Sequence, residues 1–479
     1  MTAARRPRLL GPAMLGVASG AVLVPLNSTM LAVALPSIMD EFGIDAVTVS
    51  SLVTLYLGAV TIALLASGSL GDRYGQRPVF LIGVVAFALS SLLAAVAPTF
   101  EVLALARVCQ ALSGALISTT SVALVRAIAP PDRRGAAFGL FDMLVSTSAA
   151  IGPFIGGLLV GAFGWQSLFI IAVPVALFAA VAVGFVAPPD EGYPEKSEPA
   201  EPGEPADRAG RPRPGIDVPG LVLLAAMLIA LLVAIRGLGD EGIGTVSILA
   251  ALAVIPLLVL FIRFELAAER PAVDPRLFTS RPFTAAVLGV LGTTVVLHAC
   301  FILVPLLIER LQGGTAETAG LVLLGISGLG AVAAPFGGRL SDRYGRRRPV
   351  VAGSVCLTAG LIALWLVAAG STAAAVGAML GVVGFGMGFS GSPRQAAAMD
   401  AIPTGRVGMA AGTYYTGRYL GGVLGASLAG AVLGTTVTAA GVTLGFGLLV
   451  LVGLAVVAVS FGLPDRPGRR VTVAGSPGP

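Results

Sequence analysis

Charged residues are scarce in this sequence: they make up 11% of its 479 residues, whereas 56% are hydrophobic and the mean hydropathy is +0.94. Soluble globular proteins carry about 25% charged residues, so this composition excludes an ordinary soluble domain. Aliphatic residues take the place of the missing charges, which also excludes a chain that is disordered throughout. The sequence therefore predicts a protein embedded in a lipid bilayer.

Cysteine, histidine and lysine are also scarce, and their scarcity excludes several kinds of active site. The three cysteines, Cys109, Cys300 and Cys356, lie in apolar segments and predict neither a disulfide framework nor a metal site. The only histidine is His298, no nucleophile pairs with it, and no glycine-rich phosphate loop carries a lysine. We therefore expect no enzyme, no cofactor and no ATP-driven pump. The net charge of +5 is spread over short loops, so we expect no nucleic-acid partner.

Long apolar runs are what the sequence does contain. A helix needs roughly 20 apolar residues to cross a hydrocarbon core of about 30 Å, and only helices or closed barrels satisfy their backbone groups there. The runs are continuous rather than alternating over ten residues, which excludes a barrel. We predict an all-α polytopic membrane protein with fourteen transmembrane helices over 11–37, 47–69, 78–97, 102–128, 137–162, 166–186, 217–236, 244–263, 283–307, 318–338, 349–369, 373–392, 408–433 and 441–463.

The distribution of arginine predicts the orientation of these spans. Arginines gather in alternate loops and acidic residues in the others, with Arg310 as the exception, which places both termini in the cytoplasm. The apolar part of the first span runs to about residue 37, too long for a signal peptide, so we expect this span to stay uncleaved. The segment 188–216 is rich in Pro, Glu and Gly and is expected to be a disordered linker. The predicted units are 1–187, an N-terminal six-helix bundle; 188–216, the cytoplasmic linker; 217–266, two inserted helices; 267–281, a cytoplasmic joint; 282–463, a C-terminal six-helix bundle; and 464–479, a tail.

Two polar phrases occur twice, at nearly the same offset. GSLGDRYGQR at 68–77 returns as GRLSDRYGRR at 338–347, and PPDRRGAAFG at 130–139 matches IPTGRVGMAAG at 402–412. The two agreeing offsets indicate an internal duplication. Repeats in one orientation mark one class of secondary transporter.

Four segments resemble motifs of the major facilitator superfamily, in particular its fourteen-helix drug:proton antiporter branch. They are GSLGDRYGQR, LALARVCQALSGA at 103–115, AAIGPFIGGLL at 149–159 and LNSTMLAVALP at 26–36. The resemblance implies two pseudo-symmetric six-helix bundles plus two inserted helices in the cytoplasmic membrane. It also implies export of hydrophobic small molecules such as drugs, antibiotics or secondary metabolites, by alternating access and in exchange for protons.

Two motifs are candidates for the moving parts. The repeated phrase supplies charged residues that contact partners in one state and release them in another, although the arginines could also serve only to set topology. The fifth-span motif supplies small residues and a proline, which allow helices to approach closely. The resemblance implies that this motif sets an export geometry, and the alternative is ordinary tight packing. The gating residues are Gly68, Asp72, Arg73, Gly75, Arg77, Gly338, Asp342, Arg343 and Gly345, and the antiporter-type motif is Gly152, Pro153, Gly156 and Gly157.

Arg107 with Gln110 is the main candidate for the substrate and proton pathway, because an arginine inside a membrane span is costly and by default functional. Alternatively, Arg107 extends its side chain to the headgroups. The resemblance places a proton-carrying acid near this arginine, but the sequence has Asn27 there, which cannot carry a proton. Asp142 and His298 are the alternative proton carriers, or else a helix-end aspartate and a core histidine.

Further candidates are Arg418, whose partner is unknown, and the aromatic residues Tyr56, Phe301, Phe389, Tyr414 and Tyr415. Aromatic rings favour a lipophilic, often cationic ligand, and most membrane aromatics simply pack. The expected partners are such a small molecule, protons and the bilayer, and the oligomeric state stays open, a monomer included. Asn27 keeps two alternatives open: a metabolite or lipid-related transporter with altered or absent proton coupling, and a membrane sensor that does not transport.

Overall fold

The long apolar runs form helices, since a helix bonds all its backbone groups within one segment. The structure, a computed structural model, describes residues 11–128, 134–186, 218–236, 244–268, 273–367, 370–402, 407–434 and 437–465. Within these ranges, twelve helices are long and apolar enough to cross a membrane, and α9 holds a shorter apolar stretch, Val222–Leu231. The all-helical prediction is confirmed. The predicted linker 188–216 lies outside the described residues.

The first eight helices come from the first part of the chain. They are α1 (Pro12–Met30), α2 (Leu35–Phe42), α3 (Ala46–Tyr74), α4 (Gln76–Ala95), α5 (Phe100–Ile128), α6 (Arg134–Phe163), α7 (Ser167–Ile170) and α8 (Ala172–Val186). A 3-10 turn, η1 (Leu31–Ala34), joins α1 to α2, so the two form one span.

The later helices follow the predicted linker. They are α9 (Val218–Arg236), α10 (Thr245–Ala267), a 3-10 turn η4 (Pro275–Thr279), α11 (Arg281–Leu306), a π-helical turn η5 (Leu307–Leu311), α12 (Ala316–Tyr344), α13 (Arg347–Val367), α14 (Ala373–Asp400), α15 (Val407–Leu433) and α16 (Ala439–Ser460).

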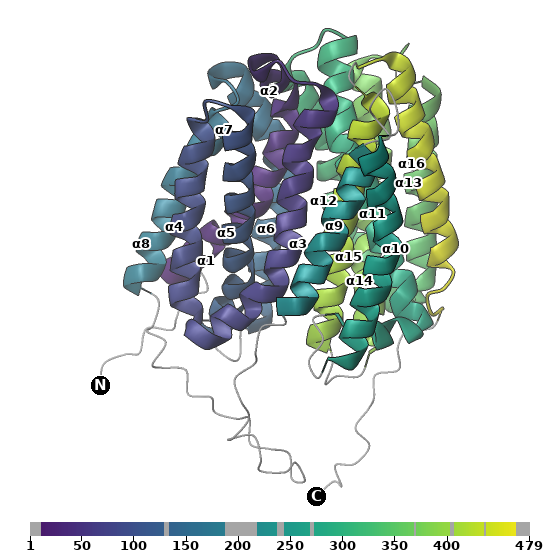
Figure 1. Ribbon diagram of the computed structural model, residues 1–479. Helices are drawn as coiled ribbons and strands as arrows, with labels where there is room; N and C mark the ends of the chain where they lie inside the picture. The colour runs from purple at the N-terminus through teal and green to yellow at the C-terminus, as the bar shows by residue number, and fades with distance from the viewer. Residues whose placement is uncertain are drawn as a thin grey trace, which may run out of the picture.

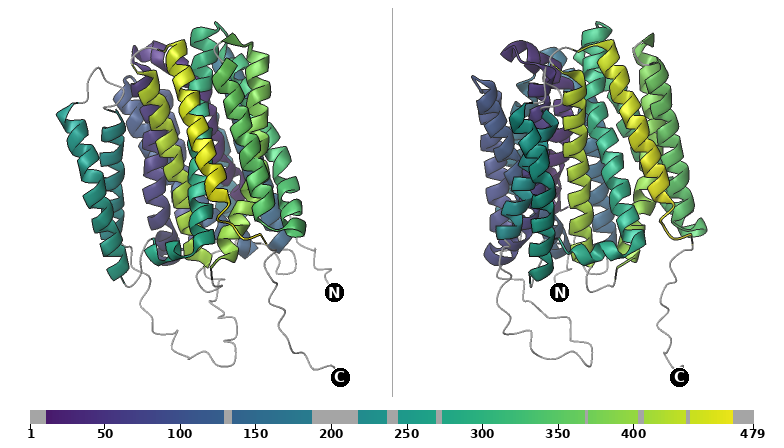
Figure 2. Two further views of the ribbon diagram at one scale, coloured as in Figure 1. Left: turned by 90° about the vertical axis from the view of Figure 1, so that its right-hand side faces the viewer. Right: turned by 45° about the vertical axis from the view of Figure 1, so that its right-hand side comes forward.

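Helix contacts divide most of these elements into two sets, which lie left and right in Figure 1. Helices α1 to α8 pack against one another, as do α11 to α16; we call these the N-terminal and the C-terminal helix groups. The groups meet mainly where α3 packs against α15 and α6 against α12. Helices α9 and α10 pack on each other and stand beside the groups as a pair, with α9 touching α3 and α15 (Figure 2).

The two copies of the repeated phrase end their helices in the same way. Helix α3 runs to Tyr74 and α12 to Tyr344, and the glycine that follows each, Gly75 or Gly345, has a φ of 94° or 88°. Glycine adopts these angles without strain. The phrase is therefore mostly helical, although the predicted spans ended at residues 69 and 338, because no proline within it precedes Gly75 or Gly345. We call this end of the molecule the lower face, and the end that carries α2 and α7 in Figure 1 the upper face.

Candidate functional site

A buried arginine lies at the centre of a polar network in the N-terminal group. Arg107, on α5, is 1% exposed and donates from Nη1 to Asn27 Oδ1 of α1 at 2.5 Å and to Gln110 Oε1 at 2.8 Å. Gln110 is itself buried, and its Nε2 donates to Ser91 Oγ of α4 at 2.7 Å. The structure thus brings together the three residues predicted for this site. The guanidinium points to these partners and not to the headgroups.

Aromatic rings complete the surroundings of Arg107. Its guanidinium carbon lies 4.2 Å from the centroid of the Tyr56 ring and 6.0 Å from that of Phe169. Neither the Arg107 Nε nor the Tyr56 hydroxyl has a hydrogen-bond partner in the described part of the chain. Amide groups and aromatic rings therefore surround this charge, and no carboxylate of a described residue contacts it. A buried charge without a counter-charge is costly, so among the described residues Arg107 does not act as a stabilising ion pair.

A second buried arginine, Arg394 of α14, was missed by the sequence analysis. It is 1% exposed and donates to Thr293 Oγ1 of α11 at 2.6 Å, to Ser354 Oγ of α13 at 3.2 Å and to Ser390 Oγ at 3.3 Å. The predicted span ended at residue 392, before Pro393, which placed Arg394 in a loop. The helix instead continues to Asp400. The apolar residues after Arg394 were the available signal for this longer helix.

His298 lies where α11 approaches α15. It is half-buried, its Nδ1 is 3.1 Å from Thr294 O, and its ring packs edge-on against Phe301 with centroids 6.0 Å apart. A Cβ atom at Gly422 of α15 would be 3.1 Å from the His298 ring, so the glycine leaves room for this close approach. Arg418, one helical turn from Gly422, is exposed and makes no hydrogen bond or ion pair with any described residue.

The predicted aromatic residues take part in separate pairwise contacts. Tyr56 belongs to the Arg107 site and Phe301 to the His298 site, whereas Phe389 stacks on Phe385 with centroids 5.6 Å apart on α14. Buried Tyr414 packs edge-on against exposed Tyr415, with centroids 6.0 Å apart. These contacts come from different helices, and a lining shared by these rings stays a prediction.

The fifth-span motif lies on α6 and forms two close helix contacts. Gly152 and Gly156 face the end of α1, where a Cβ on Gly156 would be 2.9 Å from Met30 O. Gly157 faces the other helix group, where a Cβ would be 2.6 Å from Ala316 O of α12. Pro153 also faces α12, since its carbonyl oxygen would be 2.5 Å from a Cβ on Gly320.

Several described contacts between the two groups lie toward the upper face. Arg310, next to α11, forms an ion pair of 2.6 Å with Asp40 of α2 and donates to Pro36 O at 2.9 Å. Further down, the hydroxyls of Thr54 on α3 and Ser427 on α15 are 3.4 Å apart. In the sequence analysis Arg310 was only the exception to the charge pattern. Its partner Asp40 lies 270 positions away in the chain, so the sequence pattern could not predict the pair.

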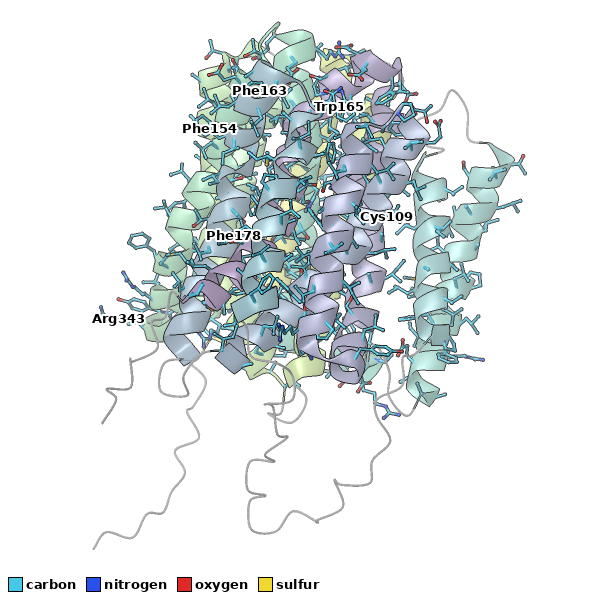
Figure 3. The ribbon with its side chains drawn as sticks, turned by 90° about the vertical axis from the view of Figure 1, so that its left-hand side faces the viewer. Cys109, Phe154, Phe163, Trp165, Phe178 and Arg343 are labelled. Atoms are coloured by element: carbon cyan, nitrogen blue, oxygen red, sulfur yellow. The ribbon has the colours of Figure 1, made fainter. Side chains whose placement is uncertain are left out.

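The predicted gating residues are described in part. The side chains of Asp72, Arg73, Asp342 and Asp142, and the surroundings of Gly68, lie outside the described residues. Arg343 is exposed at the lower face (Figure 3).

Two arginines of the repeated phrase bond within their own helix group. Arg77 donates to Gly184 O of α8 at 2.5 Å, and Arg346 forms an ion pair of 3.0 Å with Asp400. Contacts of this phrase across the groups stay a prediction.

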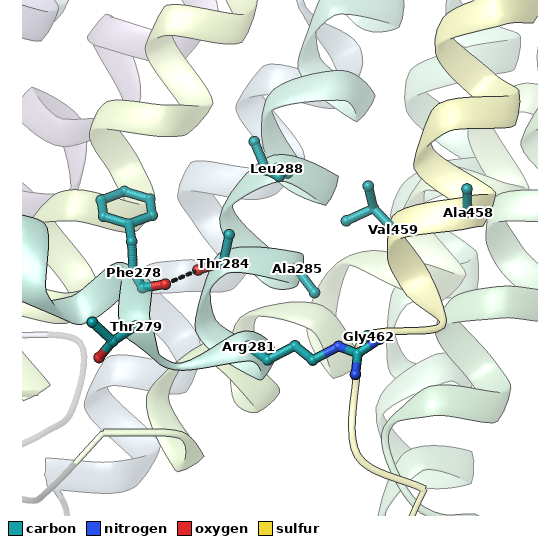
Figure 4. A pocket seen from close by; sticks show the side chains of 9 residues that line it. All are labelled: Phe278, Thr279, Arg281, Thr284, Ala285, Leu288, Ala458, Val459 and Gly462. Carbon is teal, nitrogen blue, oxygen red and sulfur yellow. Dashed lines mark hydrogen bonds between the residues drawn. The ribbon is translucent and has the colours of Figure 1, made fainter. Parts of the chain in front are cut away.

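A surface pocket of about 400 Å³ lies near the lower face, between η4, the start of α11 and the end of α16 (Figure 4). Thr284 donates to Phe278 O across its floor at 2.8 Å, and Arg281 borders it. No residue of the Arg107, Arg394 or His298 sites lines it.

Among the described residues, no group of histidine, cysteine, aspartate and glutamate could hold a metal ion.

Relatives of the chain include proteins named for transport. It is 31% identical to the "Tetracenomycin C resistance and export protein" of Streptomyces glaucescens, over 89% of this chain and 76% of that one. It is 30% identical to the "Multidrug resistance protein Stp" of Mycobacterium tuberculosis, over 88% and 75%. It is 28% identical to the "Riboflavin transporter RibZ" of Clostridioides difficile, over 85% and 84%.

The fold is also found among solved structures. A bacterial homologue of the human lysosomal transporter Spinster, in an inward-facing and unoccupied conformation, superposes with a TM-score of 0.66 at 15% identity, covering 94% of this chain and 95% of that one. The model of the Major Facilitator Superfamily matches residues 17–426. The chain therefore belongs to the Major Facilitator Superfamily, and it is a membrane transporter rather than an enzyme.

Proposed function

We propose that this transporter exports hydrophobic small molecules, such as drugs, antibiotics or secondary metabolites, across the cytoplasmic membrane by alternating access. The carrying observation is the set of close contacts between the two helix groups near the upper face, at Gly157–Ala316 and Thr54–Ser427. Contacts at one end of a two-part molecule are those that rocking would break. The names of two relatives, for tetracenomycin C export and for multidrug resistance, support the direction and the substrate class.

The proposed layout has fourteen transmembrane helices in two pseudo-symmetric six-helix bundles, with α9 and α10 as the inserted pair. A repeated contact supports it: Gly157 of α6 meets the start of α12, and Gly430 of α15 meets Ser50 near the start of α3. The lower face carries the arginine-rich phrases, and we place it in the cytoplasm together with both termini.

We further propose that export is coupled to proton entry. The residue that carries the proton then lies at a position other than 27, because Asn27 cannot carry one. Asp142 and His298 are the carriers proposed from the sequence. Glu309, in the π-helical turn beside Arg310, is a third, because its buried Oε1 has no hydrogen-bond partner among the described residues. Single π-helical turns occur frequently at functional sites, and a proton would supply the hydrogen that this oxygen lacks.

Proteoliposomes containing the purified full chain test these proposals. A lipophilic cation, ethidium, and a lipophilic anion, 8-anilinonaphthalene-1-sulfonate, are offered separately under an imposed pH gradient while dye and proton movement are recorded. Movement of either dye supports export, and accompanying proton flux that is lost in Asp142→Asn, His298→Gln or Glu309→Gln identifies the carrier. Dye movement without proton flux would refute the coupling, and no movement of either dye would refute the export of hydrophobic compounds.

A further inference from the structure

We propose that the exported substrates are amphipathic anions, and that Arg418 binds their carboxylate, sulfonate or phenolate group midway across the membrane. The inference rests on the proposed export function and specifies its substrate class. It reverses the expectation of a cationic ligand, which was based on aromatic residues alone.

The balance of charge inside the helix groups is the first observation. Three arginines, Arg107, Arg394 and Arg418, lie in helices of the two groups at least six residues from either helix end, and no described carboxylate bonds to any of them. The side chain of Asp142 lies outside the described residues. The acidic residues with described side chains lie at or near helix ends or beyond the last helix: Asp40, Glu41, Asp45, Glu101, Glu265, Asp274, Glu309, Glu317, Asp400 and Asp465.

Of these three arginines, Arg418 is the one available to a ligand. Arg107 and Arg394 are each 1% exposed, and both bond to amide or hydroxyl oxygens. Arg418 is exposed and has no hydrogen bond or ion pair with the described residues. It follows the start of α15 by 11 residues, or about 17 Å at 1.5 Å per residue, which is near the middle of a 30 Å core.

The helix face that carries Arg418 turns toward other helices. Residues three or four positions away share its face: Tyr415 accepts a hydrogen bond of 3.3 Å from Gln395 Nε2 of α14, and Gly422 meets His298 of α11. Gly422 also approaches Leu57 of α3, in the opposite helix group. Arg418 therefore lies on the side of α15 where both groups meet, and not on the side toward α9, where Leu420 packs.

These neighbours suit an anionic head group with an aromatic or aliphatic body. The guanidinium offers paired donors for a carboxylate or sulfonate, and the exposed Gln395 and Tyr415 add polar groups beside it. A cation at the same place would meet like charge. An anion that leaves a cell with a negative interior also moves down the membrane potential, so Asn27 in place of an acid does not deprive export of a driving force.

The test compares initial uptake rates of 8-anilinonaphthalene-1-sulfonate and ethidium in proteoliposomes of the full chain, for wild type, Arg418→Gln and Arg418→Lys. Arg263→Gln is the matched control, because Arg263 is an exposed arginine on α10 away from this site. We expect wild type and the control to transport the anion. Arg418→Gln should raise the anion's KM by roughly tenfold, the effect of about 1.4 kcal/mol, and Arg418→Lys should raise it less.

A measurement on wild type alone guards against a variant that fails to fold. Lipophilic compounds that differ only in a carboxylate, a neutral amide or an amine are tested as competitors, and the carboxylate should compete best. Transport of ethidium but not of the anion, or preferential competition by the amine, would overturn the anion proposal and leave export intact. Transport of neither dye would overturn both.

Discussion

At the scale of single residues, the contact between Asn27 and Arg107 is the feature that most distinguishes this transporter from the pattern it resembles. An amide oxygen stands 2.5 Å from a buried guanidinium, where the antiporter pattern has a carboxylate. The amide satisfies one donor of the guanidinium but cannot neutralise its charge. The substitution therefore separates two roles that an acid at this position would combine, bonding the arginine and carrying a proton.

Two substitutions of Asn27 test that separation. Asn27→Ala leaves Arg107 without this acceptor and should lower the free energy of unfolding by about 1–3 kcal/mol. Asn27→Asp supplies a charge-assisted bond, which is about twice as strong as a neutral one, and should raise the unfolding temperature above that of the wild type. Thermal unfolding in detergent measures both. Equal unfolding temperatures for all three proteins would contradict this account of the site.

At the scale of elements, the packing of α6 against α12 depends on a residue without a side chain. A Cβ on Gly157 would lie 2.6 Å from Ala316 O, which is closer than such contacts occur. Gly157→Leu should therefore hold the two helices apart, because overpacking costs about 1–3 kcal/mol. We expect most transport to be lost. A cysteine placed at the upper face should also become more accessible to thiol reagents.

Gly161→Leu is the matched control for this prediction. Gly161 lies one turn further along α6, and a Cβ added there would meet no described atom within 4 Å. The transport rate of this variant should equal that of the wild type. A similar loss in both variants would show that leucine is harmful anywhere in α6 and would remove the support for a specific α6–α12 contact.

The ion pair between Arg310 and Asp40 joins the two groups at the upper face. The side chains are 31% and 67% exposed, so the pair should contribute no more than about 1 kcal/mol. Asp40→Asn should therefore increase labelling of a cysteine placed at the upper face by less than about fivefold. The exchanged pair, Asp40→Arg with Arg310→Asp, should return labelling toward the wild-type rate, and no recovery would argue against a direct interaction.

At the scale of the whole molecule, the two helix groups are expected to move as bodies about their shared interface. Thr54 on α3 and Ser427 on α15 have hydroxyls 3.4 Å apart, so cysteines at these positions are close enough for a disulfide. In a background without Cys109, Cys300 and Cys356, oxidation of the double variant should abolish transport. Reduction should restore it, and each single variant should be unaffected. Full transport by the oxidised double variant would rule out opening at this place.

The structure also adds an element that sequence periodicity could not position. The pair α9 and α10 joins neither group, yet α9 touches both at α3 and α15. Leu224 and Met227 of α9 pack beside Ile62 of α3 and Leu420 of α15 in one apolar cluster. The inserted pair therefore covers the junction between the groups from outside.

The sequence alone determined the features that depend on patterns of neighbouring residues. Apolar runs specify the membrane helices because each bonds its own backbone, and the repeated phrases reveal the duplication. Arg107 and Gln110 share a helix face because they are three residues apart.

Only the tertiary structure decided the partners that are distant in the chain. Asn27 bonds Arg107 across 80 positions, Asp40 bonds Arg310 across 270, and Arg394 is enclosed by hydroxyls from three helices. Such contacts depend on how whole helices pack, which no local pattern encodes.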